Sequence, residues 1–259
     1  MSPDTPRPID NAPRPNGRQV VQGPVIRRHD QVQDTTTDQR LLQRQDDPAA
    51  WVHSDPWRVM RIQAEFVEGF GTLAELGPAI SIFGSARTKP DHPMYQAGID
   101  LARGLVERGY AVITGGGPGV MEAANKGAHD AGGTSVGLGI ELPFEASMNE
   151  YVNLGINFRY FFARKVMFLK YAQGFIVLPG GLGTFDELFE ALTLAQTGKV
   201  THFPVVLFGT EYWGGLLDWM RSQVLDQGYI SQADLDSLFV TDDLRAALDH
   251  VTSGAVGEQ

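Results

Sequence analysis

The pattern of hydrophobic and polar positions changes near residue 51, and from there it predicts alternating strands and helices. Beyond that point, short runs of β-branched and aromatic residues alternate with longer stretches in which apolar residues return every three or four positions. Strands that alternate with helices in this way favour a parallel sheet, because each crossover has to return to the starting edge.

The individual elements can be placed approximately. The first helix is expected to start at Asp55-Pro56, interpreted as a cap followed by a first-turn proline, and to end near Gly77-Pro78. The expected strands are 79–83, 110–114, 134–140, 152–158, 174–178 and 204–208, with a last strand and helix between 238 and 251. The later helices are expected at about 92–108, 120–131, 159–172, 185–196 and 213–225. We therefore expect one doubly wound, Rossmann-like α/β domain over residues 51–252 that binds its ligand beyond the carboxyl ends of the strands.

The first 50 residues differ in composition from the rest of the chain. They hold 7 of the 15 prolines, 7 basic and 7 acidic side chains, and no Phe, Trp or Tyr. Such a segment cannot bury enough apolar surface to offset the entropy lost on ordering it. We expect a disordered tail whose removal leaves stability and activity nearly unchanged, and a flexible C-terminus over residues 253–259.

Charge and composition exclude several classes of protein. Lys+Arg 21 against Asp+Glu 31 gives a net charge of -10, so a general nucleic-acid binder, which needs a positive face, is not expected. Cysteine is absent, which excludes disulfides, iron–sulfur clusters and thiol nucleophiles. No apolar run is long enough for a membrane span or a signal peptide, so we expect a cytoplasmic protein without membrane contact.

Glycine-bearing loops follow three predicted strands, and all three must leave the same edge of a parallel sheet. The first contains Ser85 and Arg87, which offer a hydroxyl group and a cation. The second runs into a helix and contains the glycines expected to hold an anion at that helix N-terminus, namely Gly116, Gly117 and Gly119, followed by Met121. A tight turn without a ligand is the alternative for this second loop. We expect the three loops to meet in one crevice.

The third loop, Leu178-Pro179-Gly180-Gly181-Leu182-Gly183-Thr184-Phe185-Asp186-Glu187, is the most specific feature of the chain. It has neither the spacing of a dinucleotide-binding fingerprint nor the lysine of a Walker loop. Amides near Gly180, Gly181 and Gly183 can still turn toward one phosphate, while Thr184 is expected to cap the helix and offer its hydroxyl group. The loop therefore predicts a site for a single phosphate.

Glu187 has two interpretations. Thr184-x-x-Glu187 matches a capping box, in which the glutamate only bonds back to the amide of the cap residue. Alternatively, a carboxylate one turn into a helix that holds a phosphate lies within reach of a ribose attached to that phosphate. The position favours the second interpretation.

Arg164 and Lys165 lie in an expected helix that is apolar on almost every face. A helix of this kind is buried or lies at a subunit interface, and charges in it are costly unless they meet an anion or a carboxylate. One alternative is that one cation reaches solvent while the other forms a structural ion pair. The other alternative is contact with the ligand.

These motifs together resemble those of the Lonely Guy family, the cytokinin-activating nucleotide phosphoribohydrolases. Residues 179–187 are similar to its P-G-G-x-G-T-x-x-E signature, residues 115–121 to its second glycine motif, and Arg164-Lys165 to its arginine position. The likeness extends over roughly residues 55–250, and the long N-terminus is more like the longer bacterial branch. It implies hydrolysis of the N-glycosidic bond of a purine nucleoside 5′-monophosphate, of cytokinin or AMP type, to free base and ribose 5-phosphate.

The resemblance also implies roles for single residues. Glu187 and Arg164 would be catalytic, the loops with Gly180–Thr184 and Gly116–Gly119 would bind the phosphate, and the ribose and base would contact Ser85, Arg87, Met121 and Lys165. No metal or cofactor is implied, and the scattered histidines have no ligand spacing. Family members are built on a dimer, so we expect at least a homodimer, with a hexamer open for the longer branch, and the helix 159–172 near the interface.

Two other functions are alternatives for this sequence. Family members were often labelled lysine decarboxylases, but that reaction needs pyridoxal phosphate on a lysine, and no lysine is placed as such a residue would be. A non-catalytic nucleotide or cofactor carrier of the same fold would use the same glycine loops without needing Glu187.

Overall fold

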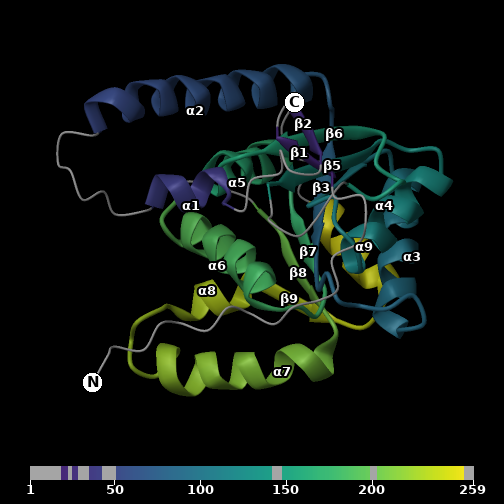
Figure 1. The fold of residues 1–259 in the computed structure, drawn as a ribbon. Coiled ribbons are helices and arrows are strands. Elements are labelled where there is room, and N and C mark those ends of the chain that lie inside the picture. The colour runs from purple at the N-terminus through teal and green to yellow at the C-terminus, as the bar shows by residue number, and fades with distance from the viewer. Residues whose placement is uncertain are drawn as a thin grey trace, which may run out of the picture.

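A seven-stranded parallel sheet forms the centre of the protein. The computed structural model describes residues 19–22, 25–28, 35–42, 51–141, 148–198 and 203–253 (Figure 1). The sheet has the order β6-β5-β4-β3-β7-β8-β9, and every neighbouring pair is parallel. Its strands are β3 (Ala79–Phe83), β4 (Ala111–Thr114), β5 (Ser135–Ile140), β6 (Leu154–Phe158), β7 (Phe175–Val177), β8 (Val205–Phe208) and β9 (Leu238–Thr241). The expected doubly wound α/β fold is confirmed.

Helices cover both faces of this sheet (Figure 1). One face packs against α3 (Pro93–Glu107), α4 (Val120–Asp130) and α9 (Leu244–Thr252). The other face packs against α5 (Phe161–Tyr171), α6 (Leu182–Gln196) and α7 (Thr210–Trp219). A π-helical turn, Met220–Leu225, continues α7, and the short α8 (Gln232–Asp236), which was not expected, precedes β9. The two layers of helices bury the strands from both sides.

The apolar runs of the strands supply both cores because successive side chains point to opposite faces. In β3, Ile80 and Ile82 belong to the core under α3, α4 and α9, whereas Ala79 and Phe83 belong to the core under α5, α6 and α7. All four are buried. This two-sided burial is typical of parallel sheets and explains why the strands read as continuous apolar runs rather than as alternating patterns.

Several helix boundaries differ from the expectation. The first long helix, α2 (Trp51–Leu73), starts ahead of Asp55, so that Pro56 lies inside it and is not a first-turn residue. One missing amide is tolerated in a helix whose apolar side chains, such as Ile62 and Phe66, pack against the core. None of the helices in the described residues combines the length and the apolar character that a membrane span requires.

The region expected to be a tail contains regular structure in its described parts. Strands β1 (Gln19–Gln22) and β2 (Val25–Arg28) pair in an antiparallel hairpin, and a short helix, α1 (Thr37–Leu42), follows. Reciprocal hydrogen bonds between Thr36 and Gln39 start this helix, as in a capping box. Residues 35–42 therefore depart from the expectation of a tail, while residues 254–259 of the expected flexible C-terminus lie outside the described residues.

The close packing of α3 against α4 depends on two glycines. At Gly98 a Cβ atom would lie 3.2 Å from the Cβ atom of Ala123, and at Gly127 it would overlap the carbonyl group of Ile99. The backbones of the two helices thus touch where a side chain would separate them.

We predict that Gly127→Ala lowers the melting temperature although alanine is the better helix former. Forcing a methyl group against the Ile99 backbone should cost about 1–3 kcal/mol. The matched control is Gly215→Ala in α7, where a Cβ atom would meet nothing within 4 Å. There the higher helix propensity of alanine should stabilise the protein by up to about 1 kcal/mol. Thermal unfolding that shows the same shift for both variants would contradict this account of the α3–α4 contact.

Candidate active site

The three glycine-bearing loops meet at the carboxyl edge of the sheet, as expected for parallel strands. Ser85 connects them: its amide donates to the carbonyl oxygen of Pro179 at 3.0 Å, and its own carbonyl oxygen accepts from the amide of Val120 at 3.0 Å. Strands β3 and β7, which precede two of the loops, are neighbours at the point where the strand order reverses. This is the place where open α/β sheets bind ligands.

A cavity of about 790 Å³ opens between these loops. Its volume is in the usual range for sites that bind small molecules or cofactors. Of the residues that the sequence singled out, those that line the cavity are Ser85, Arg87, Met121, Arg164, Gly180, Gly181, Gly183, Thr184 and Glu187. The structure therefore brings together residues that are spread over about one hundred positions of the chain.

The second glycine loop is mostly turned away from the cavity. Gly116, Gly117 and Gly119 are not among the lining residues. The amide of Gly116 donates to the hydroxyl group of Thr114, and the carbonyl oxygens of Gly116 and Gly117 accept from the side-chain amide of Asn149 at 3.1 and 3.0 Å. Gly119 has a positive φ of 69° and packs directly on the backbone of Ser85. These glycines thus shape the loop through contacts with the protein itself.

Asn125 of α4 holds the second glycine loop through buried hydrogen bonds. Its side-chain oxygen accepts from the hydroxyl group of Thr114 at 2.6 Å and from the amide of Asn149 at 2.9 Å, and its own amide donates to Ser135. Asn125 is completely buried, so each of these hydrogen bonds replaces one to water. This network was not predicted from the sequence. Its local sign in the sequence is Asn125 itself, a polar residue on the side of α4 that is otherwise apolar and buried.

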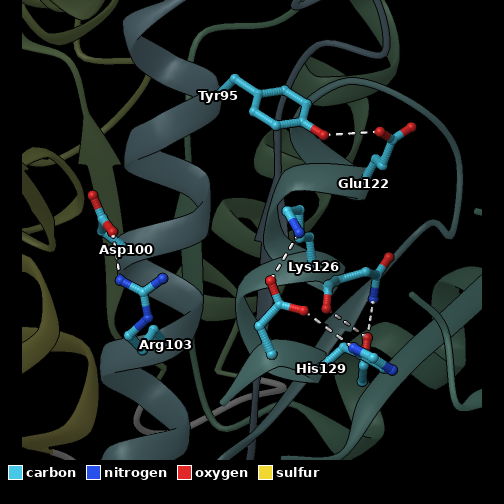
Figure 2. Close-up of polar contacts among 9 residues, drawn as sticks. Tyr95, Asp100, Arg103, Glu122, Lys126 and His129 are labelled. Carbon is cyan, nitrogen blue, oxygen red and sulfur yellow. Dashed lines mark hydrogen bonds and ion pairs between the residues drawn. The ribbon is translucent and has the colours of Figure 1, made fainter. Parts of the chain in front are cut away.

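Figure 2 shows how the start of α4 is held against α3. The hydroxyl group of Tyr95 on α3 donates to the carboxylate of Glu122 on α4 at 2.8 Å. Burial, together with this carboxylate, raises the pKa of Tyr95, which therefore stays a donor. Glu122 follows Met121, which lines the cavity, so the bond between the two helices fixes the turn that carries Met121.

The third loop enters α6 earlier than expected. Gly181 is the residue before the helix, and its carbonyl oxygen accepts from the amides of Thr184 and Phe185. Thr184 is thus the third helical residue and not the cap, so the capping-box interpretation of Thr184 and Glu187 is wrong. The amides of Leu182 and Gly183, the first two residues of the helix, have no acceptor within it, and both residues line the cavity.

Glu187 is a buried carboxylate beside two cations. One carboxylate oxygen lies 3.7 Å from Nη2 of Arg164, and the other lies 3.8 Å from Nζ of Lys165. Its side chain is only 6% exposed. Burial raises the pKa of Glu187 to about 7, although the charges of Arg164 and Lys165 partly oppose this shift. At neutral pH this carboxyl group can therefore both lose and take up a proton.

Arg164 and Lys165 have different surroundings although they are adjacent in α5. Arg164 lines the cavity, and its guanidinium group lies over the ring of Phe161, 4.8 Å from the centroid. Lys165 is not a lining residue. Its ammonium group lies 2.9 Å from Asp186 and 2.5 Å from Glu190, both on α6. Burial alone would lower the pKa of Lys165, but the bonds to these two carboxylates raise it.

The cavity also includes side chains that the sequence reading did not select. The hydroxyl group of Tyr212, in the first turn of α7, donates to the carbonyl oxygen of Gly180 at 2.6 Å. Other additions include Thr88, His92, Met94, Phe83 and Phe168. Tyr212 could have been found by the rule that identified the glycine loops, because it follows β8 at the same edge of the sheet. Phe168 could have been found one helical turn after Arg164.

A family model described as "Possible lysine decarboxylase" matches residues 121–251. A relative from rice (Oryza sativa subsp. japonica), named a probable cytokinin riboside 5′-monophosphate phosphoribohydrolase, is 32% identical over 191 residues. This match covers 71% of this chain and 82% of the relative. The chain belongs to the Lonely Guy family.

Other relatives agree with this assignment. A cytokinin riboside 5′-monophosphate phosphoribohydrolase of Mycobacterium tuberculosis is 31% identical over 166 residues, which is 61% of this chain and 86% of the relative. Among solved structures, the molybdenum cofactor carrier protein of Chlamydomonas reinhardtii is 25% identical, with a TM-score of 0.52. The match covers 69% of this chain and 98% of the carrier. The fold of the Lonely Guy family is thus shared by enzymes and by a carrier.

We predict that Glu187→Gln removes a pH dependence of stability from the protein. With a pKa of about 7 against an ordinary value of 4.5, folded Glu187 keeps a proton that the unfolded chain loses between these pH values. Wild-type stability should therefore fall as the pH rises through this window, whereas glutamine cannot titrate. The melting temperature of the variant minus that of the wild type should rise by a few degrees between pH 5 and pH 8.

The matched control for this measurement is Glu107→Gln, which changes an exposed carboxylate at the end of α3. Its melting-temperature difference from wild type should be the same at both pH values. A Glu187→Gln difference that is equally flat would contradict the raised pKa.

Proposed function

We propose that the protein hydrolyses the N-glycosidic bond of a purine nucleoside 5′-monophosphate, releasing free base and ribose 5-phosphate. The observation that carries this proposal is the buried carboxyl group of Glu187, with a pKa of about 7, in a cavity that also contains a helix N-terminus. The printed names of the rice and mycobacterial relatives support the same reaction.

The phosphate binds at the start of α6. First-turn amides and the helix dipole favour an anion there, and the hydroxyl group of Thr184 can donate to it. At Gly181 and Gly183 a Cβ atom would meet nothing within 4 Å, so the backbone is open to a ligand. This short cradle suits one phosphate, as in a nucleoside monophosphate.

Glu187 faces the ribose. The bond between C1′ and the base nitrogen breaks with its electron pair leaving on the base, and positive charge develops on the sugar. The ionised carboxylate stabilises that charge and positions a water molecule, whose oxygen bonds to C1′. The carboxylate takes one proton from the water, the departing base takes one proton from solvent, and Glu187 then returns its proton to solvent, so the carboxylate is restored. The products are the base and ribose 5-phosphate.

Arg164 has a double role in this proposal. Its charge, 3.7 Å from Glu187, helps to keep part of the carboxyl population ionised despite burial. Because it also lines the cavity, it is available to a ribose hydroxyl group or to the departing base. Ser85, Arg87 and Met121 line the same cavity and complete the ribose and base contacts, whereas the position of Lys165 supports a role in holding α6.

The residues present do not fit the decarboxylase description of the family model. Decarboxylation of lysine through pyridoxal phosphate needs a lysine that forms a Schiff base in the site. Of the lysines in the described residues, none lines the cavity, and Lys165 is bound by two carboxylates outside it. That cofactor therefore has no part in the proposed reaction.

A carrier function is the second candidate, supported by the likeness to the algal molybdenum cofactor carrier. A carrier would use the glycine loops and the cavity to hold a phosphate-bearing molecule. It would have no use for a carboxylic acid buried beside the ligand, because such a group repels the phosphate and costs stability when ionised. Free base formed from a nucleotide separates the two functions directly.

The protein is further proposed to act as at least a homodimer through α2 and α5. Residues of α5 that were expected to be covered are partly exposed in one chain, with Phe161 at 39% and Phe162 at 41%. Further apolar side chains are exposed on α2, which packs beside α5 (Figure 1), namely Trp57, Val59, Met60 and Val67. Exposed apolar side chains on two neighbouring helices favour a protein interface there.

We predict that Glu187→Gln lowers the rate of base release from a nucleoside 5′-monophosphate by about 100-fold or more, because it removes the stabilising charge while keeping the size of the side chain. Purified protein would be incubated with AMP and with an N6-isoprenoid adenosine monophosphate, and free base would be measured. Nucleotide affinity, measured by calorimetry, should stay within a few fold of wild type. Activity of the variant within about threefold of wild type would remove Glu187 from the reaction.

The complementary variant is Gly183→Ala. Its methyl group enters open space in the free protein, and alanine favours the helix, so the melting temperature should not fall. AMP affinity should nevertheless decrease, because the methyl group occupies the place of the phosphate. Unchanged affinity would move the phosphate site away from the start of α6.

We predict a solution mass of at least twice 28.3 kDa at micromolar concentration. Light scattering decides between a dimer and a larger assembly such as a hexamer. Val67→Glu, which places a charge at a side chain that is 72% exposed on α2, should lower the mass to that of one chain. The control is Tyr229→Glu, at an exposed side chain between the π-helical turn Met220–Leu225 and α8, which should leave the mass unchanged. A wild-type mass near 28 kDa would contradict the dimer.

A further inference from the structure

The segment 35–42, which contains α1, docks against the domain beside α5 (Figure 1). Thr36 and Thr37 are 7% and 9% exposed, and Leu41 packs against the core cluster under α5. The hydroxyl group of Thr37 donates to the carboxylate of Glu141, at the end of β5, at 2.7 Å. The segment is thus held on the domain both by burial and by a hydrogen bond across more than one hundred residues.

The second polar contact of this segment is at the start of α5. The carboxylate of Asp38 accepts a hydrogen bond from the amide of Phe161 at 3.1 Å. Glu65 of α2 accepts from the two preceding amides, those of Arg159 at 2.9 Å and Tyr160 at 3.3 Å. These amides have no acceptor inside the helix, and negative charge at this end matches the helix dipole. Two carboxylates from outside the sheet thus determine where α5 starts.

The same helix carries Arg164 into the cavity. Arg164 is one turn beyond Phe161, and its guanidinium group lies over the Phe161 ring. Burial raises the pKa of Asp38, whereas its bond to the Phe161 amide and the charge of Arg164 lower it. Asp38 therefore bonds to the end of the helix that carries Arg164, and it is close enough for the charge of Arg164 to affect its pKa.

We propose that residues 35–42 form a positioning strap, which holds the N-terminus of α5 through Asp38 and Thr37 so that Arg164 faces Glu187. Asp38 is a positioning residue, because it acts through α5 and does not line the cavity. The catalytic consequence rests on the proposed function, whereas the effect on α5 itself does not. The contacts named above are made by residues 36–41, so removal of residues 1–34 should leave them in place.

The test compares the full chain with variants lacking residues 1–34 or 1–42, and with Asp38→Ala and Asp38→Asn. The measurements are kcat and KM for base release from AMP, amide hydrogen exchange along the chain, and thermal unfolding. Loss of residues 1–34 should change kcat by less than about twofold. Loss of residues 1–42, or Asp38→Ala, should lower kcat about tenfold or more with little change in KM, because Arg164 is misplaced while the phosphate cradle is intact.

Exchange separates positioning from general stability. In Asp38→Ala the amides of residues 161–164 should exchange about tenfold faster, while those of β3 and β7 keep their wild-type rates. Asp38→Asn, which keeps an acceptor oxygen, should restore most of kcat and most of the protection.

Three results would overturn the strap. They are wild-type kcat and α5 exchange in Asp38→Ala, identical behaviour of the two truncations, or exchange that is faster everywhere, which would mean a purely structural contact. If the wild-type protein releases no base from any purine monophosphate, the proposed function fails, and exchange at residues 161–164 still decides on the strap.

Discussion

Every part of the candidate site depends on the parallel direction of the seven strands. Because all strands end at one edge, the loops after β3, β4 and β7 leave the sheet side by side, and the backbone of Ser85 can bond to two of them at once. Because the strand order reverses between β3 and β7, the helices that follow these strands, α3 and α6, lie on opposite faces of the sheet. The cavity opens between them. An antiparallel neighbour at either position would have sent one of the loops to the opposite edge.

Within that cavity the central feature is a carboxyl group that burial makes hard to ionise. Glu187 lies on a helix whose first residues, Leu182 and Gly183, also line the cavity, so in the proposed reaction one element supplies both the phosphate site and the acid–base group. The charges of Arg164 and Lys165 on α5 lower the free-energy cost of ionising Glu187, but the two residues differ in their other contacts. Lys165 is held by Asp186 and Glu190, whereas Arg164 remains at the cavity wall. Of this adjacent pair, Lys165 therefore links α5 to α6, and Arg164 contributes to the cavity.

The position of α5 is therefore as important as its sequence. Its inner side packs on the sheet through Ala163, Met167 and Phe168, its start is held by carboxylates from α1 and α2, and its outer side leaves phenylalanines exposed. Each of these contacts comes from a different part of the chain. In the proposed strap, this helix is the element through which the N-terminal segment positions Arg164.

The sequence alone determined the elements whose signals are local. Buried strands appear in the sequence as apolar runs, and glycine loops between a strand and a helix indicate the edge of the sheet where a ligand binds. The sheet, most of the cavity lining and Glu187 could therefore be predicted. The P-G-G-x-G-T-x-x-E motif added the resemblance to the family.

The tertiary structure decided the features that depend on distant partners. Thr184-x-x-Glu187 has the spacing of a capping box, yet the helix starts at Leu182, because Gly181 can accept the first amides. Thr36-x-x-Gln39 has the same spacing and does start a helix. That helix is held on the domain by hydrogen bonds of Thr37 and Asp38 to partners more than one hundred residues away. Composition averages over a segment and is blind to such contacts, because a few buried hydrogen bonds can order a short stretch that has no core of its own.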